Sequence, residues 1–431
     1  MPIGVPAAMR PEGAATSLLP ERSRSAYQGR VMPILFLIVF VDLVGFGLVI
    51  PLLPFYAVRF GASPEQVTLL LAIYSLVQLF TAPLWGRLSD RIGRRPVLMA
   101  SMIAFALAYL WLGVADALWM LFAARALAGA CAGNIAAAQA YIADVTTPEN
   151  RAKGMGLIGA AFGLGFIFGP ALGGYLAGNN PATANLQAPA WVAAGLSFVA
   201  LCGVLFVLRE SLPPEQRGLK PPASRVAAIL SALRRPVLSR LILIFFLVIL
   251  AFAAMESTFA LWAMAQFRWG PEQVGYVFAY VGVLSAVLQG GLIGRLVKRY
   301  GEERLLLAGL LLLAIGLLVL PFARDLAILG VAISALALGM GLTQPSMNSL
   351  ISRRAGRAEQ GSVLGVTQSV GSLSRVVGPA LAGVLFADLG RASPFWWGAG
   401  LVAVALVLTL QLVRGPGVAA LPDTEPLSST K

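Results

Sequence analysis

The feature that most constrains this chain is a series of twelve apolar segments, most of them about 20 residues long. A bilayer core about 30 Å thick is crossed by a helix of about 20 apolar residues, so these segments have the length of membrane spans. Strands would have to close into a barrel and alternate in polarity, and this alternation is absent. The sequence therefore predicts an all-α polytopic membrane protein. The predicted helices cover residues 33–56, 67–86, 97–114, 117–143, 156–177, 190–208, 238–264, 273–293, 304–322, 326–350, 362–386 and 395–413.

The charged residues are distributed unevenly between the two sets of loops. The chain is 58% hydrophobic and 12% charged, yet it carries a net charge of +13. Twenty-six of the 32 Lys and Arg residues lie in the N-terminal segment, in the loops after every second helix, and in the C-terminal tail. Lys and Arg gather in cytoplasmic loops, so both termini are predicted to be cytoplasmic in a multi-pass protein of the cell (inner) membrane. The lipid bilayer is thus the expected partner of this charge, and nucleic acid is not.

The residue inventory excludes several kinds of chemistry. The chain has no histidine, and its two cysteines, Cys131 and Cys202, lie inside apolar segments. This argues against a disulfide framework, metal sites built from Cys and His, and nucleophilic triads. No cofactor or metal is expected, and the protein is expected to be a monomer and not an enzyme. An intramembrane aspartyl enzyme would need two close carboxylates, for which Asp42 and Glu256 are the available pair.

Three short motifs recur in the same order at a spacing of about 208 residues. They are "PEQV" at Pro64 and Pro271, "GRL" at Gly86 and Gly294, and "GPAL" at Gly169 and Gly378. A period of six helices predicts two parallel six-helix bundles related by a pseudo-twofold axis along the membrane normal. The predicted parts are a disordered cytoplasmic arm (1–32), an N-terminal bundle (33–208), a cytoplasmic linker (209–237), a C-terminal bundle (238–413) and a cytoplasmic tail (414–431).

Four stretches of sequence carry a family resemblance. The loop "GRLSDRIGRRPVL" resembles the signature loop of the major facilitator superfamily, and "ARALAGACAGN" is similar to its arginine motif. The stretch "GLGFIFGPALGG" resembles the glycine-proline motif of drug/proton antiporters, and the first half, which includes "VDLVGFGLVIPLLPFY", most resembles the tetracycline-efflux group with twelve helices. The resemblance implies a secondary transporter that exports a small amphipathic or drug-like compound in exchange for protons by alternating access.

Alternatives to this function stay open within the same fold. The chain could export a metabolite or run as a proton-coupled uptake symporter, and a channel is the rival of another class. The tetracycline pumps resembled here carry a membrane acid where this chain has Ala108, so the substrate is left open. The chain has no P-loop, so an ion gradient is the expected source of energy.

Ionisable side chains lie well inside the predicted helices at only four positions: Asp42, Arg125, Glu256 and Arg375. Each would cost about 3 kcal/mol facing lipid at mid-helix, so each should face water or a partner. Asp42 lies near the middle of its helix, where a carboxyl could take up and release a proton. We therefore interpret Asp42 and Arg125 as a proton-coupling site, with a static ion pair between the two helices as the alternative.

Candidate substrate-binding residues surround Glu256, which occupies the repeat counterpart of the first helix. Phe252 and Trp262 lie on nearby turns and could bind a flat or cationic compound, although lipid packing would explain them equally well. Asn134 and Gln344 could line the pathway, or they could hydrogen-bond between helices. Arg375 has no charged counterpart in the first half. It could pair with an acid, attract an anionic group of the substrate, or extend into water.

Two motifs are predicted to act in the conformational change. In the segment 156–177, the residues Gly165, Gly169, Pro170, Gly173 and Gly174 permit close helix packing and a bend. The resemblance implies that this helix seals the interface between the halves.

The basic loop contains the residues of a predicted conformational latch: Gly86, Asp90, Arg91, Gly93, Arg94 and Arg95. By resemblance, Asp90 faces the N-terminus of helix 362–386 and keeps the cytoplasmic side shut. The alternative is a local pair between Asp90 and an arginine that only stiffens the turn. The second copy of the loop has Lys298 at the position of Asp90, so only the first copy is expected to act as a latch.

Overall fold

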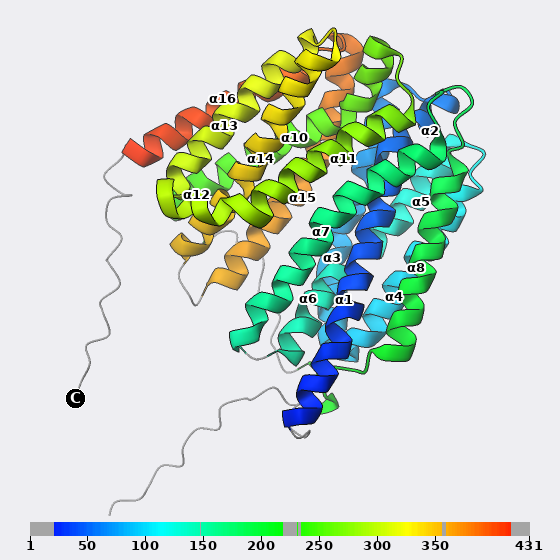
Figure 1. Cartoon of the computed structure of the whole chain (residues 1–431), viewed down its shortest axis with the longest axis vertical. Helices are drawn as coiled ribbons and strands as arrows, with labels where there is room; N and C mark the ends of the chain where they lie inside the picture. The colour runs from blue at the N-terminus through cyan, green and yellow to red at the C-terminus, as the bar shows by residue number, and fades with distance from the viewer. Residues whose placement is uncertain (1–20, 147, 219–230, 232–233, 356–358, 415–431) are drawn as a thin grey trace, which may run out of the picture.

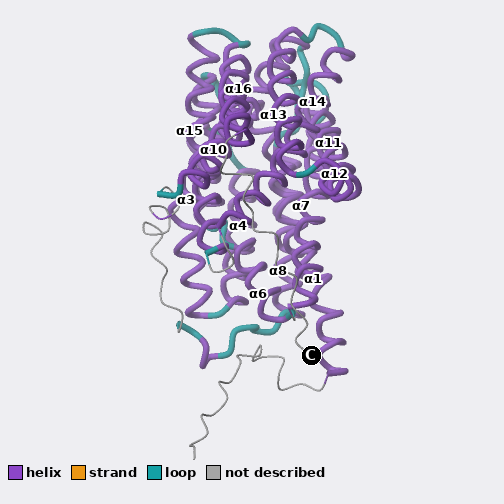
Figure 2. Tube along the Cα trace, turned by 90° about the vertical axis from the view of Figure 1, so that its left-hand side faces the viewer, coloured by secondary structure: helices purple, strands orange, loops and turns teal. Residues whose placement is uncertain are grey.

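The computed structural model describes residues 21–146, 148–218, 231, 234–355 and 359–414, and within them every regular element is a helix (Figures 1 and 2). Twelve helical stretches are long and apolar enough to cross a membrane, which confirms the twelve predicted spans. These stretches are Met32–Arg59, Pro64–Ile92, Arg94–Gly113, Leu118–Val145, Gly154–Ala177, Gln187–Val207, Pro236–Phe267, Pro271–Tyr300, Glu302–Phe322, Leu326–Ala355, Ser362–Asp388 and Ser393–Arg414.

The first half of the chain contains eight α-helices and one short 3-10 turn. In chain order they are α1 (Glu21–Val49), η1 (Ile50–Leu52), α2 (Leu53–Arg59), α3 (Pro64–Ile92), α4 (Arg94–Gly113), α5 (Leu118–Ala130), α6 (Asn134–Val145), α7 (Pro148–Ala177) and α8 (Gln187–Val207). Helix α1 begins at Glu21, so residues 21–32 are helical and the prediction of a disordered arm over 1–32 is wrong for this part. Hydropathy marks only the part of a helix inside the membrane, and a polar extension escapes it.

The second half repeats this plan with different interruptions. The described elements are η2 (Pro214–Gln216), α10 (Pro236–Phe267), α11 (Pro271–Val287), η3 (Leu288–Leu292), α12 (Ile293–Tyr300), α13 (Glu302–Val319), η4 (Leu320–Phe322), α14 (Leu326–Ala355), α15 (Gln360–Asp388) and α16 (Ser393–Arg414). About half of the predicted linker (219–230 and 232–233) and the tail beyond Arg414 lie outside the described residues.

The helices form two groups that meet along two pairs of helices (Figure 1). Within the first group α1 packs on α7 and α8, and within the second α13 packs on α14 and α16. Between the groups α7 packs on α11, and α3 packs on α15. A shift of six membrane spans exchanges these two pairs, because α3 and α11 are repeat partners, as are α7 and α15. The packing therefore has the twofold relation that the sequence repeat predicts.

Among the described residues, the closest contacts between the two groups lie toward one end of the molecule. We call the side that carries Gly93 and Gly301 the basic side, because the arginine-rich loops lie there, and we call the other end the opposite side. On the opposite side, the Glu272 amide donates to the Gly178 carbonyl across the two halves at 3.2 Å. Nearby, Gly275 packs against the Pro170 carbonyl so closely that a side chain would collide with it. The halves are therefore closed on the opposite side.

On the basic side, α7 and α11 separate. Near Gly163 on α7, an added methyl would still approach Ala286 of α11 at 3.9 Å. One and two turns further toward the basic side, Gly159 and Gly156 have open space beside them, as does Gly290 on the facing helix. The π-helical turn η3 begins here and packs on α14. The molecule is thus open between its halves on the basic side, and we call this space the interhalf opening.

The fourth span is interrupted where a single helix over 117–143 is predicted. Helix α5 ends at Ala130 and α6 begins at Asn134. The released carbonyls are satisfied by α3, because Trp85 Nε1 donates to the Ala130 carbonyl at 2.5 Å. Gly133 allows this contact, since an added methyl would lie 2.5 Å from the Trp85 side chain. Close packing between α3 and the fourth span therefore accompanies the break.

Candidate functional site

The four intramembrane charges lie on four different helices that surround the centre of the molecule. Asp42 on α1 and Arg125 on α5 are 7% and 3% exposed. Glu256 on α10 is half-buried, and Arg375 on α15 is exposed although it lies near the middle of its helix. The first half thus holds a buried pair of opposite charges, and the second half holds an accessible pair.

Asp42 is enclosed by polar groups from two neighbouring helices. The Asn134 side chain lies beside the carboxyl, although its Nδ2 atom forms no hydrogen bond of normal geometry with a described residue. Tyr109 on α4 lies close enough to interact electrostatically with Asp42. Its ring also packs against the α1 backbone, since an added methyl at Gly45 would lie 3.2 Å from the Tyr109 hydroxyl. The interruption before Asn134 places the amide at the start of α6, next to the acid.

Arg125 is held by aromatic rings and not by an acid. The guanidinium carbon lies 4.6 Å from the ring centroid of Tyr74 and 5.8 Å from that of Phe46. Its Nε atom has no hydrogen-bond partner among the described residues. The salt bridges between described residues do not include a pair of Arg125 with Asp42. The alternative of a static ion pair between these helices is therefore wrong for this conformation, and both charges are available for other interactions.

Tyr74 connects the charges of the two halves. This side chain on α3 interacts electrostatically with Asp42, with Arg125 and, across the interface, with Arg375. Arg375 in turn attracts Glu256 on the neighbouring α10. The sequence analysis did not single out Tyr74, because aromatic residues are common in membrane helices. Its position one turn before the polar Gln78 on the same helical face is the signal that could have identified it.

The two aromatic candidates on α10 have different surroundings. Phe252 lies one turn from Glu256 and is half-buried. Trp262 is 1% exposed and packs edge-on against Phe395 of α16, with ring centroids 5.9 Å apart. The structure therefore places Trp262 in the core of the second half, and the expectation that it contacts substrate is wrong for this conformation. Six residues separate it from Glu256, which corresponds to a rotation of about 240° around the helix.

Gln344 lies in a polar stretch of α14. Its side chain is half-buried, while the adjacent Thr343 and the nearby Ser346 are each 1% exposed. The hydroxyl oxygens of both neighbours lack a hydrogen-bond partner among the described residues. Buried hydroxyls are costly when unpaired, so this stretch retains capacity for additional hydrogen bonds.

The glycine motif of α7 serves two interfaces at once. Gly165, Gly169 and Gly173 face α1 of the same half, where Gly169 packs against the backbone of Gly47. Gly174, one position further round the helix, faces the backbone of Pro271 on α11 of the other half. Pro170 also lies at this second interface through its carbonyl, which packs on Gly275. Only part of the motif therefore seals the two halves, and the regular glycine row holds the first half together.

The first basic loop is organised around the buried Arg94. Its Nη1 atom donates to Asp90 Oδ1 at 2.6 Å and to Ser89 Oγ at 3.0 Å, and its Nε donates to Asp144 Oδ2 at 3.2 Å. Ser211 donates to the same Asp144 oxygen at 3.0 Å. Asp90 therefore forms the local pair in this conformation. Its predicted contact with the start of α15 is not among the interactions of the described residues.

Glu210 caps the helix that follows this loop. Its carboxylate accepts hydrogen bonds from the backbone amides of Arg94 at 2.8 Å and Arg95 at 3.2 Å, at the start of α4. An anion at a helix N-terminus is favoured by the helix dipole. Gly93 permits the approach, with φ of 111° and no space for a side chain beside Glu210. The sequence analysis did not identify this role, because Glu210 lies 116 residues away along the chain.

The remaining latch candidates have separate surroundings. Gly86 has open space on its outer side, and Arg91 is exposed. Arg95 donates from Nη2 to the Leu205 carbonyl at 2.7 Å. All of these contacts of the described residues lie within the first half.

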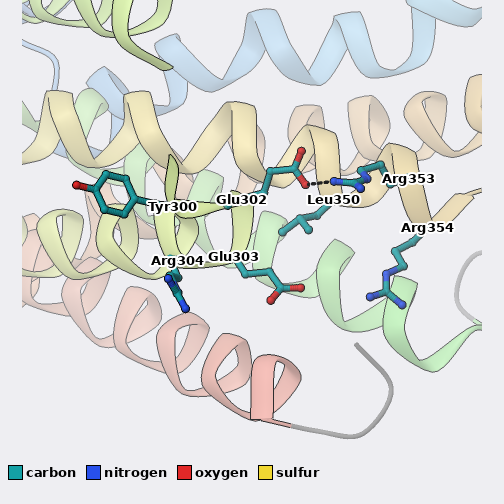
Figure 3. Close-up of a pocket in the computed structure, with 8 residues that line it drawn as sticks. Tyr300, Glu302, Glu303, Arg304, Leu350, Arg353 and Arg354 are labelled. Carbon is teal, nitrogen blue, oxygen red and sulfur yellow. Dashed lines mark hydrogen bonds and ion pairs between the residues drawn. The ribbon is translucent and has the colours of Figure 1, made fainter. Parts of the chain in front are cut away.

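The second copy of the loop encloses a hollow of about 410 Å³ at the start of α13 (Figure 3). Glu302 accepts from Arg353 Nη1 at 2.9 Å, and both residues line the hollow with Tyr300, Arg304 and Leu350. The position of Glu302 corresponds to that of Arg94 at the repeat spacing of 208. In the first half, Arg94 on the third span pairs with Asp144 at the end of the fourth span. In the second half, the acid Glu302 is on the third span and its partner Arg353 is at the end of the fourth, so the two charges are exchanged.

The described residues contain no group of three His, Cys, Asp or Glu side chains that could hold a metal ion. The candidate site consists of the four intramembrane charges, their aromatic neighbours, and the interfaces between the halves.

Comparisons with known proteins relate the whole chain to one family. The family model of the Major Facilitator Superfamily matches residues 35–379 and 290–430. The chain is 33% identical to the tetracycline resistance protein, class E, of Escherichia coli, over 88% of the chain and 94% of that relative. It is 30% identical to multidrug resistance protein 2 of Bacillus subtilis, over 86% of the chain and 92% of that relative. The crystal structure of the human organic anion transporter MFSD10 (TETRAN) is similar with a TM-score of 0.66 at 27% identity, over 89% of this chain and 99% of that one.

Proposed function

Since this chain belongs to the Major Facilitator Superfamily and resembles its tetracycline- and multidrug-resistance members, we propose that it exports small amphipathic compounds in exchange for protons by alternating access. The observation that carries this proposal is Asp42, a carboxyl buried at the middle of the first span without an ion-pair partner among the described residues. A charged carboxylate is costly there, so proton binding stabilises the residue in its neutral form.

The proposed cycle alternates between two conformations. In the conformation seen here, the interhalf opening gives access from the basic side, and contacts such as that of Gly275 with Pro170 close the opposite side. Proton exchange at Asp42 and substrate binding between the halves would favour different conformations. One charge moving through about 100 mV yields about 2.3 kcal/mol, enough for roughly a fiftyfold gradient of substrate.

We place the basic side in the cytoplasm of the cell (inner) membrane. The Lys and Arg residues of that side support this orientation, since such residues accumulate in cytoplasmic loops. The first described helix, α1, begins on the basic side, and the last, α16, ends there (Figure 1). Substrate then enters from the cytoplasm, which fits export. The relatives' names include tetracycline resistance, multidrug resistance and organic anion transport, so a broad range of amphipathic compounds is proposed.

The test is substrate flux in everted membrane vesicles. Fluorescent amphipathic drugs should accumulate when the lumen is acidic, and a protonophore should abolish the accumulation. Flux that follows only the substrate gradient and ignores the protonophore would indicate a channel. Accumulation driven by an alkaline lumen would indicate a symporter.

Replacement of the buried acid tests its role in coupling. We expect Asp42→Asn to reduce proton-driven accumulation to the level of vesicles without the protein, because an amide cannot carry the proton. The control is Asp116→Asn, which makes the same change at an exposed position between α4 and α5 and should transport normally. Undiminished driven transport by Asp42→Asn would show that this carboxyl is structural.

A further inference from the structure

Arg375 is an arginine in the middle of a membrane helix that faces the interhalf opening. It shares one face of α15 with Leu364 and Gln368, and all three are exposed. The exposed residues Leu373 and Leu381 lie on the opposite face, as expected for contact with lipid. The Arg375 side chain lies near Glu256 of α10 and Tyr74 of α3, which border the opening. Its exposure is therefore to the space between the halves.

The opening ends a short distance beyond Arg375. Two turns further along α15, Gly383 packs directly on Thr68 and Glu65 of α3, where the halves are closed. Gly371, one turn in the other direction, leaves room for the guanidinium, since an added methyl would lie 3.6 Å from Nη1. Arg375 thus lies near the closed end of the opening, in the position of a group that meets a bound molecule.

Arg375 has no direct partner within the described residues. It forms no hydrogen bond or ion pair there, and Glu256 acts on it only through longer-range attraction. A mid-membrane arginine costs about 2.5–3.5 kcal/mol on insertion. The repeat counterpart on α7 is Ile167, which packs against Gly282, so the fold does not require a charge at this position. Among the described residues, no direct hydrogen bond or ion pair of Arg375 offsets this cost.

We propose that Arg375 and Glu256 form a two-point site for an amphipathic zwitterion, in which Arg375 binds a carboxylate and Glu256 binds an ammonium group. A guanidinium presents a planar pair of donors that matches a carboxylate, and this geometry gives strong, specific hydrogen bonds. Phe252, one turn from Glu256, supplies an apolar surface for the rest of the molecule. This inference rests on the proposed function as a transporter and specifies the chemistry that the transporter recognises.

The experiment measures equilibrium binding to the purified full-length protein without a proton gradient. The probes are norfloxacin, a fluorescent zwitterion, its ethyl ester, which lacks the carboxylate, and its N-acetyl derivative, which lacks the ammonium group. We expect Arg375→Gln to raise the Kd for norfloxacin about ten- to a hundredfold, as for loss of a charge-assisted hydrogen bond. The same variant should bind the ethyl ester as the wild type does. Arg375→Lys should give an intermediate Kd for norfloxacin, because it keeps the charge but not the planar pair of donors.

The second charge gives the complementary comparison. Glu256→Gln should raise the Kd for norfloxacin and leave that for the N-acetyl derivative unchanged. Arg391→Gln, the same change in the exposed loop after α15, should change none of the three. Unaltered binding of one modified probe also shows that each variant is folded.

Two results would overturn the inference. One is that the wild-type protein binds norfloxacin no more tightly than its ethyl ester. The other is that Arg375→Gln raises the Kd values for norfloxacin and for the ethyl ester by the same factor. Because binding is measured without a gradient, either result would leave proton-driven export in vesicles standing. If the wild-type protein shows no proton-driven export in vesicles but the Kd values follow the expected pattern, the proposed function is overturned and the two-point site stands.

Discussion

At the residue scale, the central feature is Arg125, which stacks on the ring of Tyr74 and forms no salt bridge with Asp42 among the described residues. A cation over an aromatic face is stabilised by about 0.5–2 kcal/mol, depending on how well water is excluded. Tyr74 holds Arg125 in this way and also lies within electrostatic range of the second half. A neutral ring can hold a cation in place without neutralising it.

The stacking can be tested by changing the ring and the hydroxyl separately. We expect Tyr74→Leu to destabilise the protein by about 1 kcal/mol, because it removes the ring beneath Arg125. Tyr74→Phe keeps the ring and is the matched control, which should unfold as the wild type does. The measurement is thermal unfolding of the purified protein in detergent. Equal stability of the two variants would show that the ring contributes no net stacking energy.

The charged residues of the site were predictable, whereas their partners were not. Asp42, Arg125, Glu256 and Arg375 stand out because a charge inside a membrane helix is rare and costly. The tyrosine that connects them does not stand out, since an aromatic ring fits lipid, core and binding site equally well. The same ambiguity explains Trp262, which proved to pack in the core.

At the element scale, α7 shows how one helix can serve a fixed and a variable contact. Its glycine row is locked against α1, while Pro170 and Gly174 meet α11 of the other half. Small residues allow backbones to approach closely in membranes, where dispersion and packing replace the hydrophobic effect. Alternating access requires only the second contact to break.

Two alanine substitutions on α7 distinguish the effect of close packing against α1 from the effect of alanine's higher helix propensity. Gly173→Ala places a methyl against the Leu48 backbone and should destabilise the protein by about 1–3 kcal/mol. Gly159→Ala, on the same helix, meets open space and should be neutral or stabilising by up to about 1 kcal/mol. Thermal unfolding measures both. If the two variants unfold alike, the glycine row is not needed for close packing.

The number of spans was predictable from the sequence, whereas their interruptions were not. Each apolar segment had to be a helix because lipid offers no hydrogen bonds to the backbone. The break between Ala130 and Asn134 depends on the distant Trp85, which donates to the released carbonyl. The polar start of α1 is invisible to hydropathy, which registers only the membrane part of a helix.

At the scale of the whole molecule, the sequence repeat predicted the twofold arrangement but not which side is open. The repeat fixes which helices correspond, and hence that α3 with α15 mirrors α7 with α11. Which side is open depends on the relative stability of the contacts between the halves on the basic side and on the opposite side. A local sequence pattern does not predict this difference. The local pair of Asp90 with Arg94 is therefore the contact of one conformation and says nothing against a different contact in the other.

The proposed latch makes a prediction about the cycle and not about stability. The Asp90 side chain is 45% exposed, and such an ion pair contributes only about 0.2–1 kcal/mol. We expect Asp90→Asn to keep normal yield and melting temperature but to slow transport in vesicles severalfold, by weakening the conformation closed on the basic side. Lys298→Asn, at the matching position of the second copy, is the control and should have a mild effect. Equal slowing by both variants would count against a latch in the first loop.

The exchange of charges between the two loops has a consequence for assembly. Two duplicated halves in one chain could pair wrongly during insertion, because a third span can pack on either of two similar fourth spans. Packing on the wrong half would bring Arg94 toward Arg353, or Glu302 toward Asp144, and like charges at partly buried sites repel each other. The correct pairing brings opposite charges together in both halves. The reversed charges thus favour the pairing of each third span with the fourth span of its own half.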